Sequence, residues 1–494
     1  MAPEFYSAIA ARDNYPQTFL YNFFSVTQTK TCGNDARNRA DYASINDCHC
    51  LLSISAFVLV FDHIVIVYSL MRYLFIITCF TLCFGCQKNT PPPPSFDGDV
   101  LVGLLHSRTG TLSISENTVA EAELLAINEI NRAGGLLIDG VRLRIVPVEE
   151  DGESDGSTFA QKAEKLIDVS KVEVIFGGWS SSSRKAMLPV IESREHLLFY
   201  PLQYEGEECS EFVFYAGATP NQQAGPAIDW LLQNRGDRFF LVGSDYVYPH
   251  TVNRIISRQV LQAGGVIVAE RYVPLGDQNL TEIVQAIKIA LPEGGVIINT
   301  INGDSNVAFF QDAFALGVTP ENNYTVMSFS VSEEEVKAIG AQYLEGSLAT
   351  WNFFQAIETP ASKSFTRNFK TMHGVHRVTN DPAEAAYSMV HLWARAAERA
   401  GSTSPDRVRE KLIGTTFDAP HGRVEVAENH HLRKRVYIGE VQLDGQFSIV
   451  FNAGVVEPRT WSQLLPDNEG YRCDWTQSRP DAARFYSDEQ DVRQ

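Results

Sequence analysis

From residue 98 onward, short apolar runs alternate with segments in which apolar residues recur at helical spacing. Residues 100–105 form an apolar run suited to a buried parallel strand, and residues 119–133 repeat apolar side chains at helical intervals until Gly134 and Gly135 end the helix. The alternation continues with strands at 143–148, 172–176 and 197–200 and helices at 159–169 and 183–194. It predicts a parallel sheet covered by helices.

A second series of strands and helices follows Pro220. We expect helices at 221–233, 251–263, 280–291 and 306–314, and strands at 239–242, 266–273, 296–300 and 326–329. Later come a long helix at 383–399 and a hairpin at 435–451 that turns at Asp444 and Gly445. The pattern predicts an α/β fold with two Rossmann-like lobes, each built on a parallel sheet, joined by a hinge of several strands.

The last third of the chain is expected to complete both lobes. We assign residues 98–220 and 346–434 to lobe 1, and residues 221–345 and 435–475 to lobe 2. Residues 476–494 form a polar tail. The chain would then cross between the lobes several times.

The first 97 residues are interpreted as a segment that directs export and does not belong to the folded body. Met71 and Arg72 precede an apolar stretch at 74–84, which ends at Gly85 and Cys86; this order is typical of a lipoprotein-type export signal at 71–86, with the lipid on Cys86. A retained membrane anchor is the alternative, since residues 51–85 are mostly apolar. We interpret residues 1–70 as an upstream extension before the true start, and the Pro-rich segment 87–97 as a stiff spacer.

Charge and cysteine content narrow the class of protein. The formal charge of −19, without a basic stripe, argues against a nucleic-acid partner. Of eight cysteines, six lie before residue 90, which leaves Cys209 and Cys473 in the folded body. These two could pair in an oxidising compartment, a question that the sequence leaves open.

Four loops that follow predicted strands are rich in hydroxyl and aromatic side chains. In parallel sheets, ligands bind at the carboxyl ends of the strands. One such loop alone could be a helix cap, but two loops from each lobe would converge on one cleft. The loops read Gly-Gly-Trp-Ser-Ser-Ser-Ser-Arg-Lys at 177–185, Tyr-Pro-Leu-Gln-Tyr-Glu-Gly at 200–206, Gly-Ser-Asp-Tyr-Val-Tyr-Pro at 243–249 and Asn-Gly-Asp-Ser-Asn at 302–306.

With Gly-Ala-Thr-Pro-Asn-Gln-Gln at 217–223, these segments resemble the branched-chain-amino-acid type of periplasmic binding protein. Within it they are similar to the branch that binds urea and short-chain amides for ABC importers. The resemblance covers about residues 98–475 and also includes Asn-Asp-Pro at 380–382 and Asn-His-His-Leu at 429–432. One departure is Gly178, where relatives often carry cysteine.

The resemblance implies a set of ligand contacts. Gln203 stands where the urea branch differs from receptors for aliphatic amides, which tend to have a hydroxyl where Leu202 stands. Urea offers four N–H donors and one carbonyl, so its site needs several acceptors and at least one donor. The expected contacts are Trp179, Ser180, Ser181, Tyr200, Gln203, Tyr246, Tyr248 and Asp304.

Catalytic and metal roles are weaker interpretations. The serines at 180–183 do not lie in a Gly-x-Ser-x-Gly elbow, and Arg184 and Lys185 open a helix and are expected to reach solvent. Cys209 lies in an acidic segment, which disfavours a reactive thiolate. The adjacent His430 and His431 lack partners spaced for a metal site. We therefore expect no enzyme, no metal and no cofactor.

The leading hypothesis is an exported receptor whose lobes close on urea or a short-chain amide and deliver it to an ABC permease. The protein would be periplasmic or on the cell surface, anchored to the membrane by its lipid. The alternative is a regulatory amide receptor that releases a partner when the ligand binds. A third possibility, an amide hydrolase, would not retain intact ligand.

Overall fold

The computed structural model describes residues 94–476. The expected upstream extension, the signal with Cys86, most of the spacer and most of the polar tail lie outside the described residues. Among residues 94–476, no helix has the length and apolar content needed to cross a membrane.

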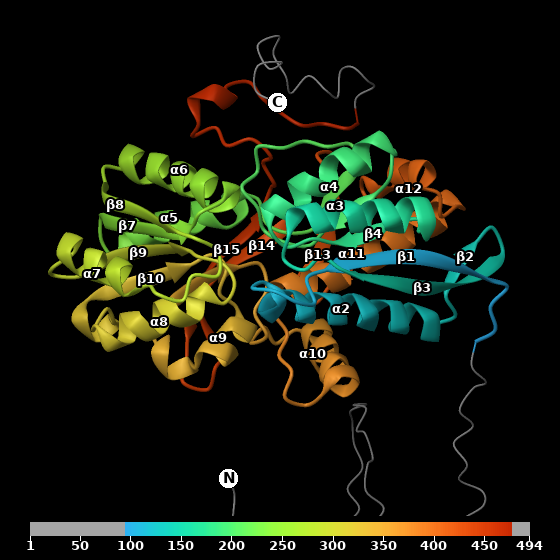
Figure 1. Cartoon of the computed structure of the whole chain (residues 1–494). Helices are drawn as coiled ribbons and strands as arrows, with labels where there is room; N and C mark the ends of the chain where they lie inside the picture. Colours follow the sequence, from blue (N-terminus) through green and yellow to red (C-terminus); the bar gives the residue numbers. More distant parts are fainter. Residues whose placement is uncertain (1–93, 477–494) are drawn as a thin grey trace, which may run out of the picture. The chain divides into compact units, whose positions relative to one another are not determined.

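Lobe 1 is built on a six-stranded sheet in the order β2-β3-β1-β4-β5-β6. Its central strand β1 carries Val102 and Leu104, both almost fully buried. In Figure 1, α3 and α4 lie on one face of this sheet and α2 on the other, where it packs against α11. The strands are β1 (Gly98–His106), β2 (Leu136–Ile138), β3 (Val141–Asp151), β4 (Ile175–Gly177), β5 (Leu198–Tyr200) and β6 (Val213–Tyr215). The helices are α2 (Ser113–Arg132), α3 (Gly156–Glu164), α4 (Ser181–Ser193), α10 (Pro360–His373), α11 (Asp381–Ala400) and α12 (Pro405–Leu412).

Lobe 2 is built on a seven-stranded sheet in the order β15-β14-β11-β10-β9-β7-β8. Its helices α5 and α6 lie on one face and α7 and α8 on the other (Figure 1). The strands are β7 (Arg238–Ser244), β8 (Val266–Val273), β9 (Gly295–Thr300), β10 (Tyr324–Ser328), β11 (Leu348–Trp351), β14 (Lys434–Val441) and β15 (Phe447–Val456). The helices are α5 (Ala224–Asn234), α6 (Val247–Gln262), α7 (Thr281–Ala290), α8 (Ser305–Ala315) and α9 (Glu333–Ile339).

The two-lobed α/β fold is confirmed, but both sheets are mixed rather than parallel. β2 pairs antiparallel with β3, and β14 pairs antiparallel with both β11 and β15. The β2–β3 and β14–β15 pairs are hairpins, because a short turn can only return the chain antiparallel, whereas β11 and β14 are far apart in the sequence. The expected lobe boundary at residue 346 is wrong for β11, which hydrogen-bonds between β10 and β14 in lobe 2. We therefore define lobe 1 as residues 98–220 and 353–433, and lobe 2 as residues 221–352 and 434–456.

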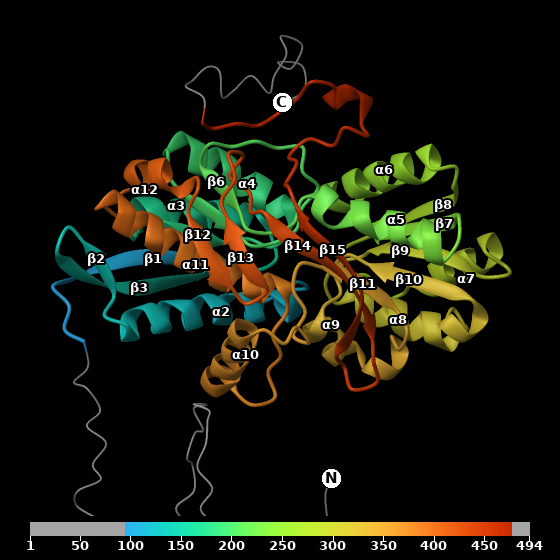
Figure 2. The same cartoon turned by 180° about the vertical axis from the view of Figure 1, so that it is seen from behind.

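The hinge consists of chain crossings near residues 216–223, 352–359 and 426–433, which Figure 2 shows from behind. Buried amides tie the crossings together. The Gln222 side chain donates to the carbonyls of Leu432 and Val456 at 2.8 and 2.9 Å. The Asn352 side chain donates to the carbonyls of Gln222 and Arg435 at 3.3 and 2.9 Å. Because buried backbone carbonyls need partners, these contacts stabilise a defined hinge geometry.

After β15 the chain returns to lobe 1 as a C-terminal segment, residues 457–475. The Glu207 carboxylate accepts hydrogen bonds from the Ser462 amide at 3.0 Å and the Asn468 side chain at 2.6 Å. Cys209 and Cys473 form a disulfide with their Cα atoms 6.0 Å apart, which answers the question of their pairing. The segment therefore fastens the end of lobe 2 to the loop that follows β5 in lobe 1.

We predict that removing this disulfide destabilises the folded state. The bridge joins residues separated by 264 positions, so it restricts a large loop in the unfolded chain. The double variant Cys209→Ser/Cys473→Ser should lose about 2–4 kcal/mol in the free energy of unfolding. Guanidinium denaturation measures this loss, with reduced wild type as the matched sample. Equal stability of oxidised and reduced wild type would contradict the prediction.

Candidate functional site

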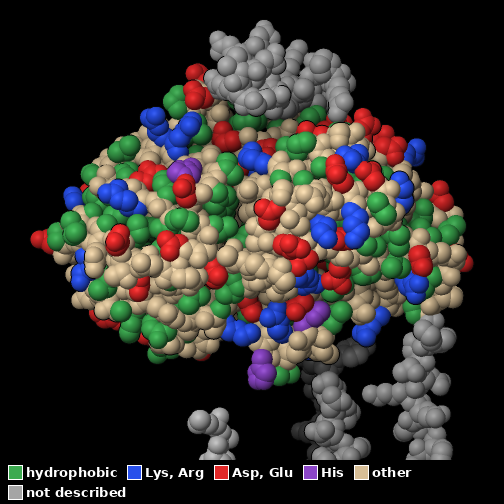
Figure 3. Space-filling model, viewed as in Figure 1, with side chains coloured by type: hydrophobic (Ala, Val, Ile, Leu, Met, Phe, Trp, Pro, Cys, Tyr) green, Lys and Arg blue, Asp and Glu red, His purple; other side chains and the backbone are tan. Residues whose placement is uncertain are grey.

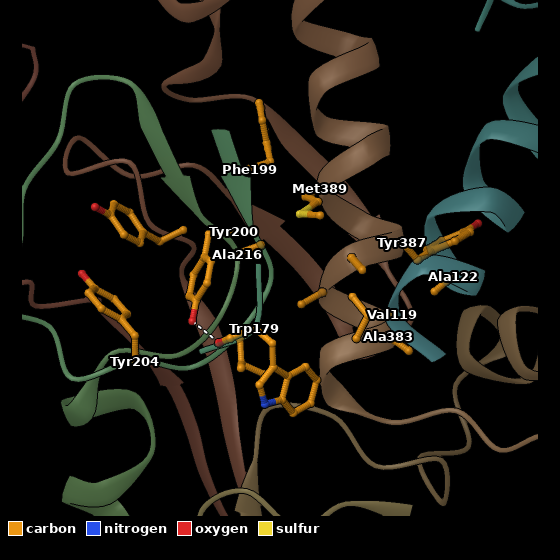
Figure 4. Packing of buried hydrophobic residues seen from close by; sticks show 14 of the residues in the cluster. Val119, Ala122, Trp179, Phe199, Tyr200, Tyr204, Ala216, Ala383, Tyr387 and Met389 are labelled. Carbon is orange, nitrogen blue, oxygen red and sulfur yellow. Dashed lines mark hydrogen bonds between the residues drawn. The ribbon is translucent and has the colours of Figure 1, made fainter. Parts of the chain in front are cut away.

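The turn after β4 places Trp179 at the carboxyl edge of the lobe 1 sheet. Gly177 has φ +147°, and a Cβ there would lie 2.0 Å from the Leu105 carbonyl oxygen, so only glycine fits. The Tyr200 hydroxyl at the end of β5 donates to the Trp179 carbonyl (Figure 4). Both side chains are almost fully buried. The ends of β4 and β5 thus brace each other.

Gly178 explains how close these two strand ends come. Its φ is +82°, and a Cβ there would meet the Met187 methyl at 2.9 Å and the Tyr200 ring at 3.3 Å. A larger side chain at this position would require the Met187 methyl and the Tyr200 ring to move.

Ser180 and Ser181 are buried but already engaged inside lobe 1. The Ser180 hydroxyl accepts from the Ser183 amide at 3.0 Å, which caps α4. The Ser181 hydroxyl donates to Glu205 and accepts from Arg184 at 3.0 Å. The hydroxyl proton of Ser181, one of the expected contacts, is therefore already donated within lobe 1.

Arg184 is fully buried, so the expectation that it reaches solvent is wrong. Its guanidinium donates to Glu205 and to Glu208, each at 2.9 Å. It also lies over the rings of Tyr200 and Tyr204, 5.0 and 4.6 Å from their centres. The two carboxylates compensate the buried cation, and the rings add cation–π attraction. Lys185 next to it is 40% exposed, as expected, and reaches Glu208 at 3.1 Å.

Arg184 and Lys185 together lower the pKa of the Glu208 carboxyl. Burial by itself would raise the pKa of this carboxyl, but Arg184 and Lys185 outweigh burial and lower the pKa to about 2. The Tyr215 hydroxyl donates to the same carboxylate at 2.8 Å. Glu208 is therefore ionised at neutral pH, and its ionised form stabilises the fold.

Gln203 reaches from the loop after β5 into lobe 2. Its side-chain nitrogen donates to the Phe329 carbonyl at 2.8 Å and to the Ser330 hydroxyl at 3.1 Å, beyond the end of β10. This anchoring defines which way the amide faces, because only its NH2 group can donate to a carbonyl. The Gln203 Oε1 atom is left buried without a hydrogen-bond partner.

Lobe 2 supplies Tyr246, Tyr248 and Asp304. The two tyrosine rings at the start of α6 lie 6.4 Å apart. Burial raises the pKa of Tyr246, and the nearby phenols of Tyr248 and Tyr200 raise it further, so residues of both lobes meet here. The Tyr248 hydroxyl lies near Gln203 and Ser330 without a hydrogen bond of normal geometry. Burial also raises the pKa of Asp304, against its own amide and that of Ser305.

Four expected contacts share one property. Each has a buried polar atom without a hydrogen-bond partner: Trp179 Nε1, Gln203 Oε1, Tyr248 OH and Asp304 Oδ1. Leaving such an atom unpaired costs about 1–3 kcal/mol, and further examples in the described residues lie on Trp393 and His421. Two of them belong to lobe 1 and two to lobe 2. The sequence motifs therefore coincide with unsatisfied hydrogen-bonding capacity on both sides of the lobe junction.

Several supporting residues were not expected from the sequence. Glu205 and Glu208 lie in an acidic run that is easily interpreted as a solvated face; a buried arginine partner could have been inferred only from the fold.

A Gly-x-Ser-x-Gly sequence does occur at 152–156, between β3 and α3. Ser154 there has φ +58°, but its hydroxyl donates to the Thr109 carbonyl at 2.9 Å and accepts from the Leu112 amide at 3.1 Å. It braces the loop after β1.

The histidine pair belongs to the core of lobe 1. His430 stacks on Phe214 at 4.1 Å and His431 on Tyr215 at 4.4 Å between ring centres. Burial lowers the pKa of His430 to about 3 and that of His431 to about 4, so both rings are neutral. Over residues 94–476, no group of three or more His, Cys, Asp or Glu side chains is placed to hold a metal ion.

Comparison with known proteins identifies the family. Residues 100–467, most of the chain, match the family model described as a periplasmic binding protein domain. The chain belongs to the periplasmic binding protein family. This periplasmic binding protein has the type I fold, with mixed sheets in two lobes. Its fold is similar to that of a solute-binding protein of an ABC transporter from R. palustris, whose structure was solved in complex with benzoate. The TM-score is 0.65 at 16% sequence identity, and the match covers 74% of this chain and 100% of that one.

Two curated proteins show how far sequence similarity extends. The leucine-, isoleucine-, valine-, threonine- and alanine-binding protein of Pseudomonas aeruginosa is 24% identical over 353 residues, which cover 68% of this chain and 87% of that protein. The limonene hydroxylase of Geobacillus stearothermophilus is 30% identical over 115 residues, 23% of this chain. The chain spans only 21% of the length of that hydroxylase.

We predict that Glu208 makes the fold acid-sensitive. Its lowered pKa means that its contribution, roughly 3 kcal/mol, is fully present above pH 4.5 and is lost as the pH falls towards 2. Glu208→Gln should lower the free energy of unfolding at pH 7 and flatten its pH dependence between 5 and 3. Guanidinium denaturation across that range tests this, with the exposed Glu293→Gln as the control. Parallel pH curves for wild type and Glu208→Gln would contradict the prediction.

Proposed function

We propose that this periplasmic binding protein is an exported receptor that binds urea, or a short-chain amide, between its lobes and delivers it to an ABC importer. The observation that carries the proposal is the set of four buried polar atoms without partners on expected contact residues of both lobes. A ligand held there would satisfy them. Membership of the family supports the receptor role, which requires no catalysis.

The balance of donors and acceptors favours a donor-rich ligand. Gln203 Oε1 and Asp304 Oδ1 can only accept hydrogen bonds, and the Trp179 indole N–H can only donate. The Tyr248 hydroxyl can do either. Urea has four N–H donors and one carbonyl, so it can give its N–H groups to the acceptors and receive the indole N–H. Formamide and acetamide have fewer N–H groups and leave more of these acceptors unsatisfied.

The same balance disfavours ligands that carry a carboxylate. A carboxylate needs several donors or a cation, but Arg184 is neutralised by Glu205 and Glu208. The hydroxyls of Ser180 and Ser181 are engaged within lobe 1, as described above. Asp304 would add like-charge repulsion. Amino acids and benzoate, named for related proteins, are therefore expected to bind this chain weakly.

The proposal extends to partners and location. The family is one of periplasmic proteins, and the relatives with solved structures include solute-binding proteins of ABC transporters. We therefore propose a membrane permease as the partner that receives the ligand. Anchoring through a lipid on Cys86 remains part of the proposal, since Gly85 and Cys86 follow an apolar stretch in the sequence.

Calorimetric titration with urea, formamide, acetamide, leucine and benzoate tests the proposal. Wild type should bind urea most tightly. Asp304→Asn and Trp179→Phe should each raise the Kd about 10- to 100-fold, because the first replaces an acceptor oxygen by an NH2 group and the second removes the indole N–H together with part of the aromatic wall. The matched control is Asp245→Asn, an exposed carboxylate beside Tyr246. Tight binding of leucine or benzoate, unaffected by these variants, would refute the urea assignment.

A further inference from the structure

Helix α2 presents one side to lobe 2 over several turns. Just before it, the Thr111 carbonyl accepts from the Asp304 amide at 3.3 Å. One turn on, the Ser115 hydroxyl donates to Glu335 of α9 at 2.5 Å. Thr118 and Glu121 follow at helical spacing. Positions 115, 118 and 121 of α2 form one stripe, because residues three apart share a helix face, and Thr111 contacts Asp304 from the turn before the helix.

Arg377 connects this stripe to lobe 2. It lies between α10 and α11 in lobe 1, where its guanidinium donates to Glu121 at 2.6 and 2.9 Å and to the Thr118 hydroxyl at 2.9 Å. Its Nη1 atom donates to Glu334 of α9 at 2.9 Å. In Figures 1 and 2, α9 lies at the edge of lobe 2 nearest to α2 and α10. One arginine thus bridges a carboxylate from each lobe.

We propose that Arg377 and Glu334 form an electrostatic latch that stabilises the closed arrangement of the lobes. The inference rests on the proposed capture of a ligand between them. Arg377 and Glu334 are only 21% and 11% exposed, so water and salt screen their attraction less than at an open surface. Both are positioning residues, since neither is among the expected ligand contacts.

The pair is suited to repeated opening. If the lobes separate, Arg377 keeps Glu121 and Thr118 within lobe 1. Glu334 keeps Lys337, one turn further along α9 at 3.6 Å. Neither charge is left buried without a partner, which would be the largest cost of breaking an ion pair. The latch can therefore bias closure without locking the lobes together.

Figure 3 shows that acidic and basic side chains are interspersed on the face with this junction, without a long basic stripe. This face therefore shows no segregation of opposite charges onto the two lobes. A specific, short-range pair such as Arg377–Glu334 supplies orientation that a diffuse field does not.

Hydrogen–deuterium exchange of the full chain tests the latch without depending on the identity of the ligand. In Arg377→Gln and in Glu334→Gln, amides at 107–112 and 303–306, where the lobes touch, should exchange about fivefold faster or more than in wild type. The core strands β7 and β9 should be unchanged. The double variant should not exchange much faster than Arg377→Gln, because that single change already removes the contact with Glu334.

The control is Arg367→Gln on α10, whose side chain bonds only within lobe 1, to Ser364. If Arg377 had a purely local role, Arg377→Gln would speed amide exchange only near residues 372–380, and Glu334→Gln would exchange like wild type. That result would overturn the latch. With urea present, both latch variants should release it about fivefold faster or more. If wild type does not bind urea, the ligand assignment fails, while the exchange measurement still decides the latch.

Discussion

The fully buried Arg184 is the constraint on which the carboxyl edge of the lobe 1 sheet depends. A guanidinium without water must be matched by carboxylates, and Glu205 and Glu208 come from the loop that follows β5. That requirement joins the start of α4 to residues 200–210, and so determines where Trp179, Tyr200 and Gln203 lie. Removing one carboxylate would leave the buried Arg184 with a single counter-charge, which should destabilise the fold.

The same cluster shapes the chemistry available to a ligand. The charge of Arg184 is neutralised by Glu205, and its guanidinium also donates to the Ser181 hydroxyl. The loops after β4 and β5 therefore offer a ligand neither this cation nor the Ser181 hydroxyl. What remains is the indole N–H of Trp179 in lobe 1 and the unpaired oxygens of Gln203, Tyr248 and Asp304, which come from both lobes. Neither lobe alone presents the full set. In the proposed receptor, ligand binding and closure would therefore be two aspects of one event, to which the Arg377–Glu334 contact would contribute.

Much of the fold was predictable from local pattern. Strands such as β1, β7 and β9 are continuous apolar runs because they are buried on both faces, and their flanking helices show helical spacing. The short strands β6 and β11 were missed. Val213–Tyr215 and Leu348–Trp351 are too short to show a period, and they become strands only by pairing with neighbours already in place. The antiparallel edges and the lobe boundary at β11 follow from the same pairing.

The sequence by itself determined the two-lobed α/β architecture and the residue types at the ends of the strands, because periodicity and loop chemistry are local properties. It did not determine which of those side chains are spent on the protein's own structure. Ser180 and Ser181 look as available as Trp179 or Gln203 in sequence, yet their hydroxyls are consumed by a helix cap and by the Arg184 cluster. The disulfide between Cys209 and Cys473, the burial of Arg184 and the bridge from Arg377 to Glu334 likewise join residues far apart in the chain. Tertiary structure alone decides such contacts, because hydrogen bonding and charge compensation depend on distance in space rather than on spacing in sequence.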